Sequence, residues 1–541
     1  MTRSSVDQEG AAPGARRAGG PGVVGEATGG RGDRRPGRGH RRSAEPGSPR
    51  PKRRILRWSA LTLAVVILGT AGAGYLYYEH LNANIQKDKL NLGDSDVPQA
   101  TPNAAGQTPL NVLLIGSDSR NSARDLKLGG SKADVGRPPL ADVQMLVHVS
   151  ADRTNMSVVS LPRDTMIPIP RCTDPHTGHK YPALSLAMAN ESLGRGGPGC
   201  TVATWQKLTD IHIDHFMMVD FSGVVDMADA IGGVPVCVTQ NVWSHTSDGH
   251  GSGLKLKAGT TYVKGQQALQ WLRTRYGFED GTDLGRTHAQ HMYMNAMVRQ
   301  MRKNATLTNP GAMRSLAETA TKALKVDEGL GLAKLYDLSE EFKKVPTERI
   351  TMTTLPTVQW SQDHDRLVPA PDDADQLISM VRDDTPLDGR GVKHKATQVA
   401  AKTPTDPDGK IAVQVRNGTG SDSEAPASRR AGGVAQILQG KGFTQATADT
   451  TPASEARTTV LYPSADLEGD AQAVAKALGI PLKQVRKSTG VSGVTLLVGA
   501  DWRTGTAYKA PTEPTKPPSS SAVLNGDKKD ACMKVQPGYT W

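Results

Sequence analysis

From Trp58 to Tyr78 the chain runs for 21 residues without a charged side chain. A helix rises about 1.5 Å per residue, so this run is long enough to span the roughly 30 Å hydrocarbon core of a bilayer. A cleaved signal peptide has a similar apolar core, but the long polar stretch ahead of this one favours an uncleaved signal anchor over residues 55–78. The segment therefore divides the chain into a part before a membrane and a larger part beyond it.

The part before the span, residues 1–54, has thirteen Lys and Arg against five Asp and Glu, which gives a net charge of +8 out of +11 for the whole chain. Its composition is rich in Gly, Pro, Arg and Ser and cannot bury enough apolar surface to fold. Basic residues next to a span stay in the cytoplasm. We therefore expect a disordered cytoplasmic tail, a cell-membrane anchor and an extracellular folded part. The rest of the chain carries a net charge of only +3, so we do not expect the folded part to bind nucleic acid.

Four cysteines fit a location outside the cytoplasm, where disulfides persist. Cys172 and Cys200 flank one loop rich in Pro and Gly, and we expect them to be bridged. Four cysteines permit three pairings, which leaves the partners of Cys237 and Cys532 open. No Cys-x-x-Cys spacing occurs, which argues against a zinc site.

Apolar strand patterns alternate with helical patterns after residue 109, which predicts a layered α/β domain. The strand patterns include NVLLIG, VQMLVHVS, MSVVSLP and HFMMVDF, and the helical ones include VATWQKLTDI and SGVVDMADAIGG. A second, smaller α/β domain begins near KIAVQVRNGTG. The predicted organisation is a spacer over 79–108, the first domain over 109–385, a polar linker over 386–408, the second domain over 409–502 and a mobile Pro/Ser/Lys-rich tail over 503–541.

The stretch LRTRYGFEDGTDLGRTHAQ, residues 272–290, places three arginines around one turn. Arg273 and Arg275 are two residues apart, so on an extended chain their guanidinium groups face the same side. A helix starting at Thr282 or Asp283 would place Asp283, Arg286 and Gln290 on one face. Arginine binds phosphate oxygens with two parallel hydrogen bonds and keeps its charge. The stretch therefore predicts a phosphate-binding cluster, with a surface salt-bridge network as the alternative.

Two aspartates and two further charged residues lie near the ends of predicted strands, where ligands bind in α/β folds. Asp118 follows NVLLIG, Asp142 opens the next strand, and Arg163 and Asp164 follow the third. Arg120 and Arg137 lie in the loop between the two aspartates. Carboxylates beside arginines suit a magnesium ion that bridges to a diphosphate. Taken singly, each aspartate also fits an ordinary turn or cap.

Other candidate sites are weaker. Four histidines have spacings that suit ordinary surface positions better than a metal site: His212, His215, His288 and His291. GSDSR is not a nucleophile elbow, because Arg120 replaces the last glycine, and no Gly-x-x-x-x-Gly-Lys phosphate loop occurs.

The segments VLLIGSDSR, ADVQMLVHVSADR, VVSLPRDT, IDHFMMVDFSGVVDMADAIGGVPV, ALQWLRTR and DLGRTHAQ occur in one order. With these six segments in this order, the chain resembles the LytR–CpsA–Psr family of cell-wall glycopolymer ligases over about residues 109–385. The second domain, from VQVRNGTG to LLVGADW, resembles the LytR C-terminal domain that is often appended to these enzymes in actinobacteria.

The resemblance implies a three-layer α-β-α sandwich with a central mixed sheet. It also implies transfer of a polyprenyl-pyrophosphate-linked glycopolymer onto peptidoglycan as a phosphodiester, outside the membrane, with release of polyprenyl phosphate. It assigns Asp118 and Asp142 to Mg²⁺ (or Mn²⁺). It assigns the pyrophosphate to Arg163, Arg273, Arg275, Arg286 and Gln290, with Arg137 as a further match at a longer spacing. The acceptor hydroxyl needs a base, for which Asp142 and Asp164 are both candidates that the sequence does not separate, and we expect Arg163 to take part in the chemistry.

Two positions depart from the family pattern. Asp142-Val143 replaces Asp-Thr, and Ala289-Gln290 replaces Arg-Gln, which puts substrate range in question. Three rivals stay open on the sequence. The same site with water as acceptor would make a polyprenyl-diphosphate pyrophosphatase, and loss of activity would leave a non-catalytic wall-binding or regulatory protein. The arginine-rich tail also suggests a transcription regulator, but the tail contains no recognition helix for DNA.

Overall fold

The computed structural model falls into two compact units, Met1–Thr70 and Ala71–Trp541. It describes residues 51–541 apart from 91, 93–96, 101, 104, 118–135, 248–250, 305–309, 391–400, 421–423, 489, 512–513, 522 and 526–531. The described part of the first unit is the beginning of helix α1 (Pro51–Asn84).

Helix α1 contains the uncharged run from Trp58 to Tyr78. Within the described ranges it is the one helix long and apolar enough to cross a membrane, from Ile55 to Asn84. Its large apolar side chains are exposed, with Leu56 and Leu68 each 71% accessible. Side chains of this kind are stable in contact with lipid rather than water. The structure thus agrees with a single membrane-anchoring helix.

An eight-stranded mixed sheet forms the centre of the second unit. β2 pairs in parallel with β9 and antiparallel with β3, while β4 pairs in parallel with β15. The strands in spatial order are β1 (Gln86–Asp88), β14 (Leu324–Asp327), β9 (His215–Asp220), β2 (Leu110–Ser117), β3 (Ala141–Val149), β4 (Met156–Ser160), β15 (Ile350–Thr354) and β23 (Leu524–Asn525).

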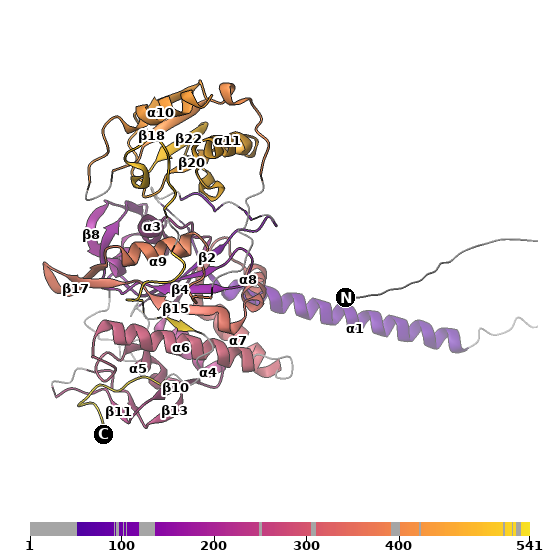
Figure 1. Cartoon of the computed structure of the whole chain (residues 1–541). Coiled ribbons are helices and arrows are strands. Elements are labelled where there is room, and N and C mark those ends of the chain that lie inside the picture. The colour runs from indigo at the N-terminus through magenta and orange to yellow at the C-terminus, as the bar shows by residue number, and fades with distance from the viewer. Residues whose placement is uncertain are drawn as a thin grey trace, which may run out of the picture. The chain divides into compact units, whose positions relative to one another are not determined.

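Both faces of this sheet are buried, which explains why its strands are almost continuously apolar. On one face Leu113 of β2 packs with Trp205 of α3 (Pro198–Thr209) and with α9 (Asp373–Arg382). On the other, Val112 packs with α8 (Leu332–Lys344) and α6 (Asp283–Asn304). Figure 1 shows α3 and α9 on one side of the sheet and α6 on the other. The predicted three-layer α-β-α sandwich is confirmed.

A helical layer with short hairpins extends the α6 side around Trp271, Phe278 and Tyr293, all fully buried. Its elements are α4 (Phe221–Ala230), β10 (Val234–Val238), β11 (Val242–Trp243), β12 (Lys255–Leu256), β13 (Gly259–Val263), α5 (Gln266–Arg273) and α7 (Pro310–Ala323). The remaining short strands form three hairpins outside the main sheet: β5 (Met166–Ile169) with β8 (Leu184–Met188), β6 (Cys172–Thr173) with β7 (Lys180–Tyr181), and β16 (Thr357–Trp360) with β17 (Asp363–Pro369).

The C-terminal part has its own five-stranded sheet and its own core, as predicted. Only the β20–β22 pair is antiparallel. Val415 and Leu496 are fully buried at its centre. Its elements are β19 (Ala446–Asp449), β18 (Val413–Asn417), β22 (Val494–Val498), β20 (Thr459–Tyr462), β21 (Val485–Lys487), α10 (Arg430–Gly440) and α11 (Glu468–Leu478). It is a small α/β domain.

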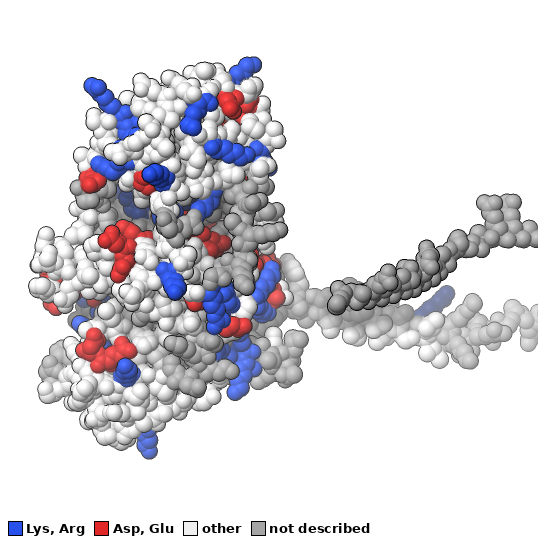
Figure 2. All heavy atoms as spheres, in the orientation of Figure 1, with Lys and Arg blue, Asp and Glu red and all other residues white. Residues whose placement is uncertain are grey.

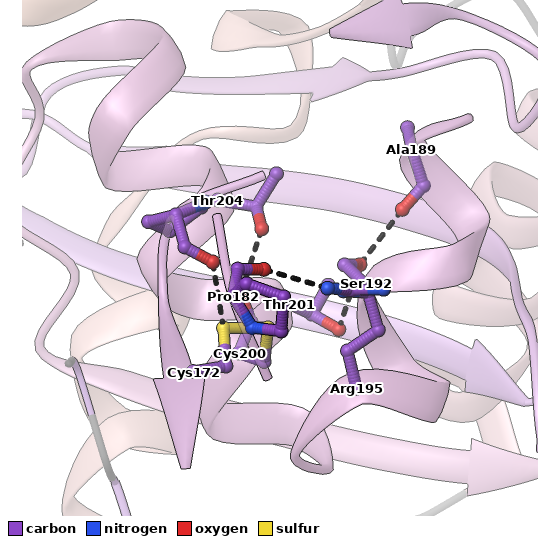
Figure 3. The surroundings of a disulfide bond; sticks show 9 residues. Cys172, Pro182, Ala189, Ser192, Arg195, Cys200, Thr201 and Thr204 are labelled. Carbon is purple, nitrogen blue, oxygen red and sulfur yellow. Dashed lines mark hydrogen bonds between the residues drawn. A yellow bond between two sulfur atoms is a disulfide. The ribbon is translucent and has the colours of Figure 1, made fainter. Parts of the chain in front are cut away.

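The predicted disulfide between Cys172 and Cys200 is present and joins β6 to the first turn of α3. Figure 3 shows its surroundings, in which Thr204 donates to the Cys200 carbonyl at 2.8 Å. Arg195 donates to the carbonyl of Pro182 at 2.6 Å, which holds the enclosed loop. A second disulfide, Cys237–Cys532, links residues 295 positions apart. All four cysteines are therefore paired.

Removing the first disulfide should destabilise the protein measurably. In the chain-entropy model, freeing a loop of 28 residues lowers the free energy of unfolding by roughly 3 kcal/mol. Alanine is the suitable replacement, because both cysteines are buried and a serine would bury an unpaired hydroxyl. We expect the Cys172→Ala/Cys200→Ala protein to unfold at lower urea concentration than the wild type with a similar slope. Identical midpoints would contradict a stabilising role.

The last residues of the chain are attached to the first domain, which the sequence did not predict. Cys532 is covalently attached to β10, and the amide of Met533 donates to the Cys237 carbonyl at 2.8 Å. Met533 is fully buried in the core around Trp271. The low hydrophobicity of residues 503–541 conceals this attachment, because a disulfide and backbone hydrogen bonds need no apolar pattern.

Candidate active site

Several strands of the central sheet begin or end on the same side of it, and we call this side the strand edge. Ser117 at the end of β2 pairs with Ala141 at the start of β3 and with Asp220 at the end of β9. Ser160 at the end of β4 pairs with Thr354 at the end of β15. Residues that follow β2, precede β3 or follow β4 are therefore brought to the same edge, where α/β folds bind ligands.

Three of the predicted residues are in contact at this edge. Nη1 of Arg163 donates to Oδ1 of Asp142 at 3.1 Å, and its Nε lies 3.4 Å from Oδ2 of Asp164. Their side chains are 17–27% exposed, so the cluster is accessible but partly desolvated. An arginine between two carboxylates is held in one orientation. The structure thus brings together the three residues predicted to take part in catalysis.

Three further residues of the predicted site are not seen in contact with this cluster. Arg137 lies just before β3 and is exposed. Asp118, the second expected metal ligand, and Arg120 lie outside the described residues, so the predicted carboxylate pair is represented in the structure by Asp142 alone.

The turn that carries the arginines joins α5 to α6. Arg273 is the last residue of α5, and the chain becomes extended only at Thr274. The expectation that Arg273 and Arg275 face one side of an extended segment is therefore wrong. The first of them is helical because QQALQWLR continues without a breaker. Arg275 is exposed, and its Nε donates to the Gly281 carbonyl at 3.3 Å.

The new helix that was predicted after the turn is present. α6 begins at Asp283, and the Arg286 amide donates to the carbonyl of Thr282. Gln290 is 8% exposed, and its Nε2 donates to the Leu272 carbonyl at 3.1 Å. Gln290 thus ties α6 to the end of α5 and fixes the span of the arginine turn, a role that the sequence did not indicate.

Helix α6 is also attached to the strand edge. Nε2 of His291 is 2.9 Å from the Ser160 hydroxyl, three residues before Arg163. Burial lowers the pKa of His291 to about 3, so this imidazole is neutral at physiological pH. The pair links α6 to β4, the strand that precedes Arg163. Sequence reasoning missed it, and the only available signal was the position of His291 next to Gln290.

The three other histidines singled out in the sequence each have a partner of their own. His212 is 2.8 Å from the Val97 carbonyl, His215 is 3.1 Å from Asp327, and His288 is 2.6 Å from Glu279. Across the described ranges there is no group of three His, Cys, Asp or Glu residues placed to hold a metal ion without help from a ligand.

The two departures from the family pattern lie in closely packed surroundings. A Cβ on Gly116 would be 2.8 Å from the Cβ of Val143, so a glycine is needed where β2 faces β3 next to Asp142. Ala289 is fully buried, and its carbonyl accepts a hydrogen bond from Trp271 Nε1 at 2.9 Å. At this buried position a small side chain lets α6 pack against α5.

The buried histidine predicts a pH dependence of stability. The folded protein keeps His291 neutral down to about pH 3, whereas the unfolded chain binds a proton near pH 6.5. The unfolded state therefore binds more protons in this range, and the free energy of unfolding falls as pH falls from 6.5 toward 3. The slope from this group is about 1.4 kcal/mol per pH unit.

His291→Gln should remove this dependence, because a glutamine amide can still hydrogen-bond to Ser160 without titrating. We expect urea unfolding curves of the variant to change less between pH 7 and pH 5 than those of the wild type. Parallel pH profiles for the two proteins would show that His291 is not the titrating group.

Two parts of the chain match known protein families. Residues 75–381 match the model of the LytR_cpsA_psr family, and residues 410–502 match a model described as LytR cell envelope-related transcriptional attenuator. Cell wall biosynthesis protein LcpA of Corynebacterium glutamicum is 28% identical over 321 residues, which cover 56% of this chain and 60% of the relative. The chain therefore spans less than two thirds of that protein.

A second relative is the polyisoprenyl-teichoic acid–peptidoglycan teichoic acid transferase TagV of Bacillus subtilis. It is 26% identical over 309 residues, which cover 56% of this chain and 72% of TagV. Among solved structures, a LytR-Csp2A-Psr enzyme from Actinomyces oris aligns with a TM-score of 0.40 and 20% identity, covering 55% of this chain and 96% of that one.

Proposed function

Because the chain belongs to the LytR_cpsA_psr family over more than half of its length, we propose that it is an extracytoplasmic phosphotransferase that attaches a glycopolymer to peptidoglycan. The donor is a polyprenyl-diphosphate-linked glycopolymer, and the product is a phosphodiester. The observation that carries the proposal is the contact of Arg163 with Asp142 and Asp164 at the strand edge. The names of TagV and LcpA, a teichoic acid transferase and a cell wall biosynthesis protein, support it.

The proposed reaction is a displacement at phosphorus. An acceptor hydroxyl oxygen of peptidoglycan bonds to the sugar-side phosphorus while the bridging P–O bond breaks and polyprenyl phosphate leaves. Charge builds on the leaving phosphate, and fixed arginines offset that charge in a partly desolvated site. Arg163 is already oriented for this by its two carboxylates, and Arg273, Arg275 and Arg286 supply further positive charge from the α5–α6 turn.

The hydroxyl must lose its proton as the new bond forms. Asp142 and Asp164 are the two carboxylates that flank Arg163, and one of them accepts this proton. The arginine between them keeps both carboxylates at the point where the diphosphate is gripped.

A magnesium ion fits the chemistry of the donor set. Mg²⁺ is usually held by one or two carboxylates together with substrate phosphate oxygens rather than by a cage of protein ligands. Asp142, which accepts a hydrogen bond from Arg163, would be one such carboxylate, and Asp118 would be the second. When bound, the ion would supply further positive charge against the diphosphate.

The test of the proposal is a product assay with a synthetic polyprenyl-diphosphate-linked oligosaccharide and peptidoglycan fragments. We expect a new phosphodiester between glycan and peptidoglycan together with polyprenyl phosphate. Release of a free sugar phosphate without attachment would identify a pyrophosphatase instead. Binding of the donor without any product would identify a non-catalytic wall protein.

The proposed placement outside the membrane is tested separately. The basic residues before Trp58 should retain the N-terminus in the cytoplasm. An alkaline phosphatase reporter fused after Trp541 folds to an active enzyme only outside the cytoplasm, so we expect activity. Its absence, with an active cytoplasmic reporter at the same position, would reverse the orientation.

A further inference from the structure

The last ten residues, Cys532–Trp541, form a strap across the arginine turn. The Glu279 amide donates to the Lys534 carbonyl at 3.0 Å. The Gln536 amide donates to the Gly277 carbonyl at 3.0 Å, and the Gly277 amide donates back to Oε1 of Gln536 at 3.0 Å. The strap is therefore fixed to the same turn that carries Arg275.

The strap brings aromatic rings next to this turn. Tyr539 stacks with Tyr276 at a centroid distance of 6.5 Å, and its carbonyl accepts from the Trp243 amide at 2.8 Å. Trp541 donates through Nε1 to the Leu256 carbonyl at 3.3 Å. Lys255 Nζ lies 4.8 Å from the ring of Trp243 and 4.3 Å from that of Trp541. Four aromatic side chains and one lysine thus line one surface, which we call the aromatic surface.

These rings are held by the strap and its neighbours, and three of them are accessible to solvent. Trp243 is 40% exposed, Tyr276 is 38% exposed and Trp541 is 47% exposed. Aromatic residues make up only 4% of the chain, so their concentration beside one turn needs a reason. Exposed apolar patches of fixed rings are typical of binding sites, because a ligand gains contact with the rings without paying to order them.

We propose that the aromatic surface binds the sugar units of the lipid-linked donor. This inference rests on the proposed function, because it assumes that Arg275 grips the diphosphate. The guanidinium of Arg275 lies 5.9 Å from the Tyr276 ring. The first sugar is bonded directly to the diphosphate, so it must lie beside Tyr276, and the following sugars extend over Tyr539 toward Trp541 and Trp243. The C–H faces of pyranose rings pack on aromatic faces.

The test compares two ligands of equal charge that differ in sugar. The methyl ester of farnesyl diphosphate, which we call the capped ligand, and farnesyl diphosphate carrying a pyranose trisaccharide are titrated into the full-length chain in nanodiscs by calorimetry. We expect the trisaccharide to strengthen wild-type binding roughly tenfold, and Trp541→Ala or Trp243→Ala to reduce that gain about threefold to tenfold. Both variants should bind the capped ligand as tightly as the wild type does.

Matched variants keep the result interpretable. Tyr336→Ala removes a ring of 64% exposure on α8, remote in sequence from the aromatic surface, and should change neither affinity. Trp541→Phe keeps an aromatic face and should restore part of the gain, which a mere loss of folding would not allow.

The outcomes separate the inference from the proposed function. Equal wild-type affinity for the two ligands would overturn the aromatic surface as a sugar site while leaving the diphosphate site in place. An equal loss for both ligands in Trp541→Ala would also overturn it, because the ring would then act only on the arginine turn. No binding of either ligand would remove the proposed diphosphate site and, with it, this inference.

Discussion

Replacing Arg275 by lysine should lower glycopolymer transfer about a hundredfold, although the positive charge is retained. Lysine loses the planar fork that binds two phosphate oxygens at once, and loss of one such contact in the transition state typically costs roughly 3 kcal/mol. Arg275 is exposed on the turn and hydrogen-bonds to the Gly281 carbonyl, so the change should leave the fold intact. The measurement is the initial rate of phosphodiester formation from the synthetic donor.

Arg390→Lys is the matched control for this experiment. Arg390 is exposed and lies beyond α9, away in sequence from the site, so its replacement should leave the rate unchanged. A wild-type rate for Arg275→Lys would mean that charge alone suffices and that the bidentate contact does not contribute. Figure 2 shows other Lys and Arg side chains interspersed with Asp and Glu on the face drawn, which offers further exposed controls.

Replacing Asp142 by alanine should have the second large effect. The change removes the carboxylate 3.1 Å from Arg163 and one of the two proposed magnesium ligands. We expect transfer to fall at least about a hundredfold, since both the orientation of the arginine and the binding of the ion are lost. Wild-type activity should respond to added magnesium and to chelation, whereas the residual activity of the variant should respond to neither.

Asp365→Ala serves as the control, because Asp365 is an exposed carboxylate in the β17 hairpin. Full activity of Asp142→Ala that is also insensitive to chelator would remove Asp142 from the proposed metal site. Reduced activity with an unchanged magnesium response would instead confine Asp142 to orienting Arg163.

The arginine turn illustrates the limit of spacing arguments. The helix from Asp283 was predicted because Thr282 and Asp283 precede a helical pattern, and α6 begins there. The two-residue argument for Arg273 and Arg275 does not apply, since it holds only for extended chain and α5 continues through Arg273. Neither the bond of Gln290 to Leu272 nor that of His291 to Ser160 leaves a periodic pattern in the sequence.

The sequence alone determined the membrane helix, the alternation of strands and helices, the family and the Cys172–Cys200 pairing. These features depend on local composition and order: an uncharged run of fixed length, apolar strands buried on two faces, and cysteines flanking one loop. Such patterns involve residues that are close in the sequence, so they can be recognised without knowledge of contacts between distant segments.

Only the tertiary structure decided what converges on the site. Cys237 and Cys532 are 295 residues apart, yet their bond attaches the end of the chain to β10. From there Lys534 and Gln536 exchange backbone hydrogen bonds with the arginine turn, and Tyr539 stacks with Tyr276. Asp142 and Arg163 meet because β3 and β4 are paired antiparallel, with Met145 opposite Ser160. Contacts between segments so far apart are set by strand register and by packing of the whole domain, and single residues in a linear sequence carry no information on either.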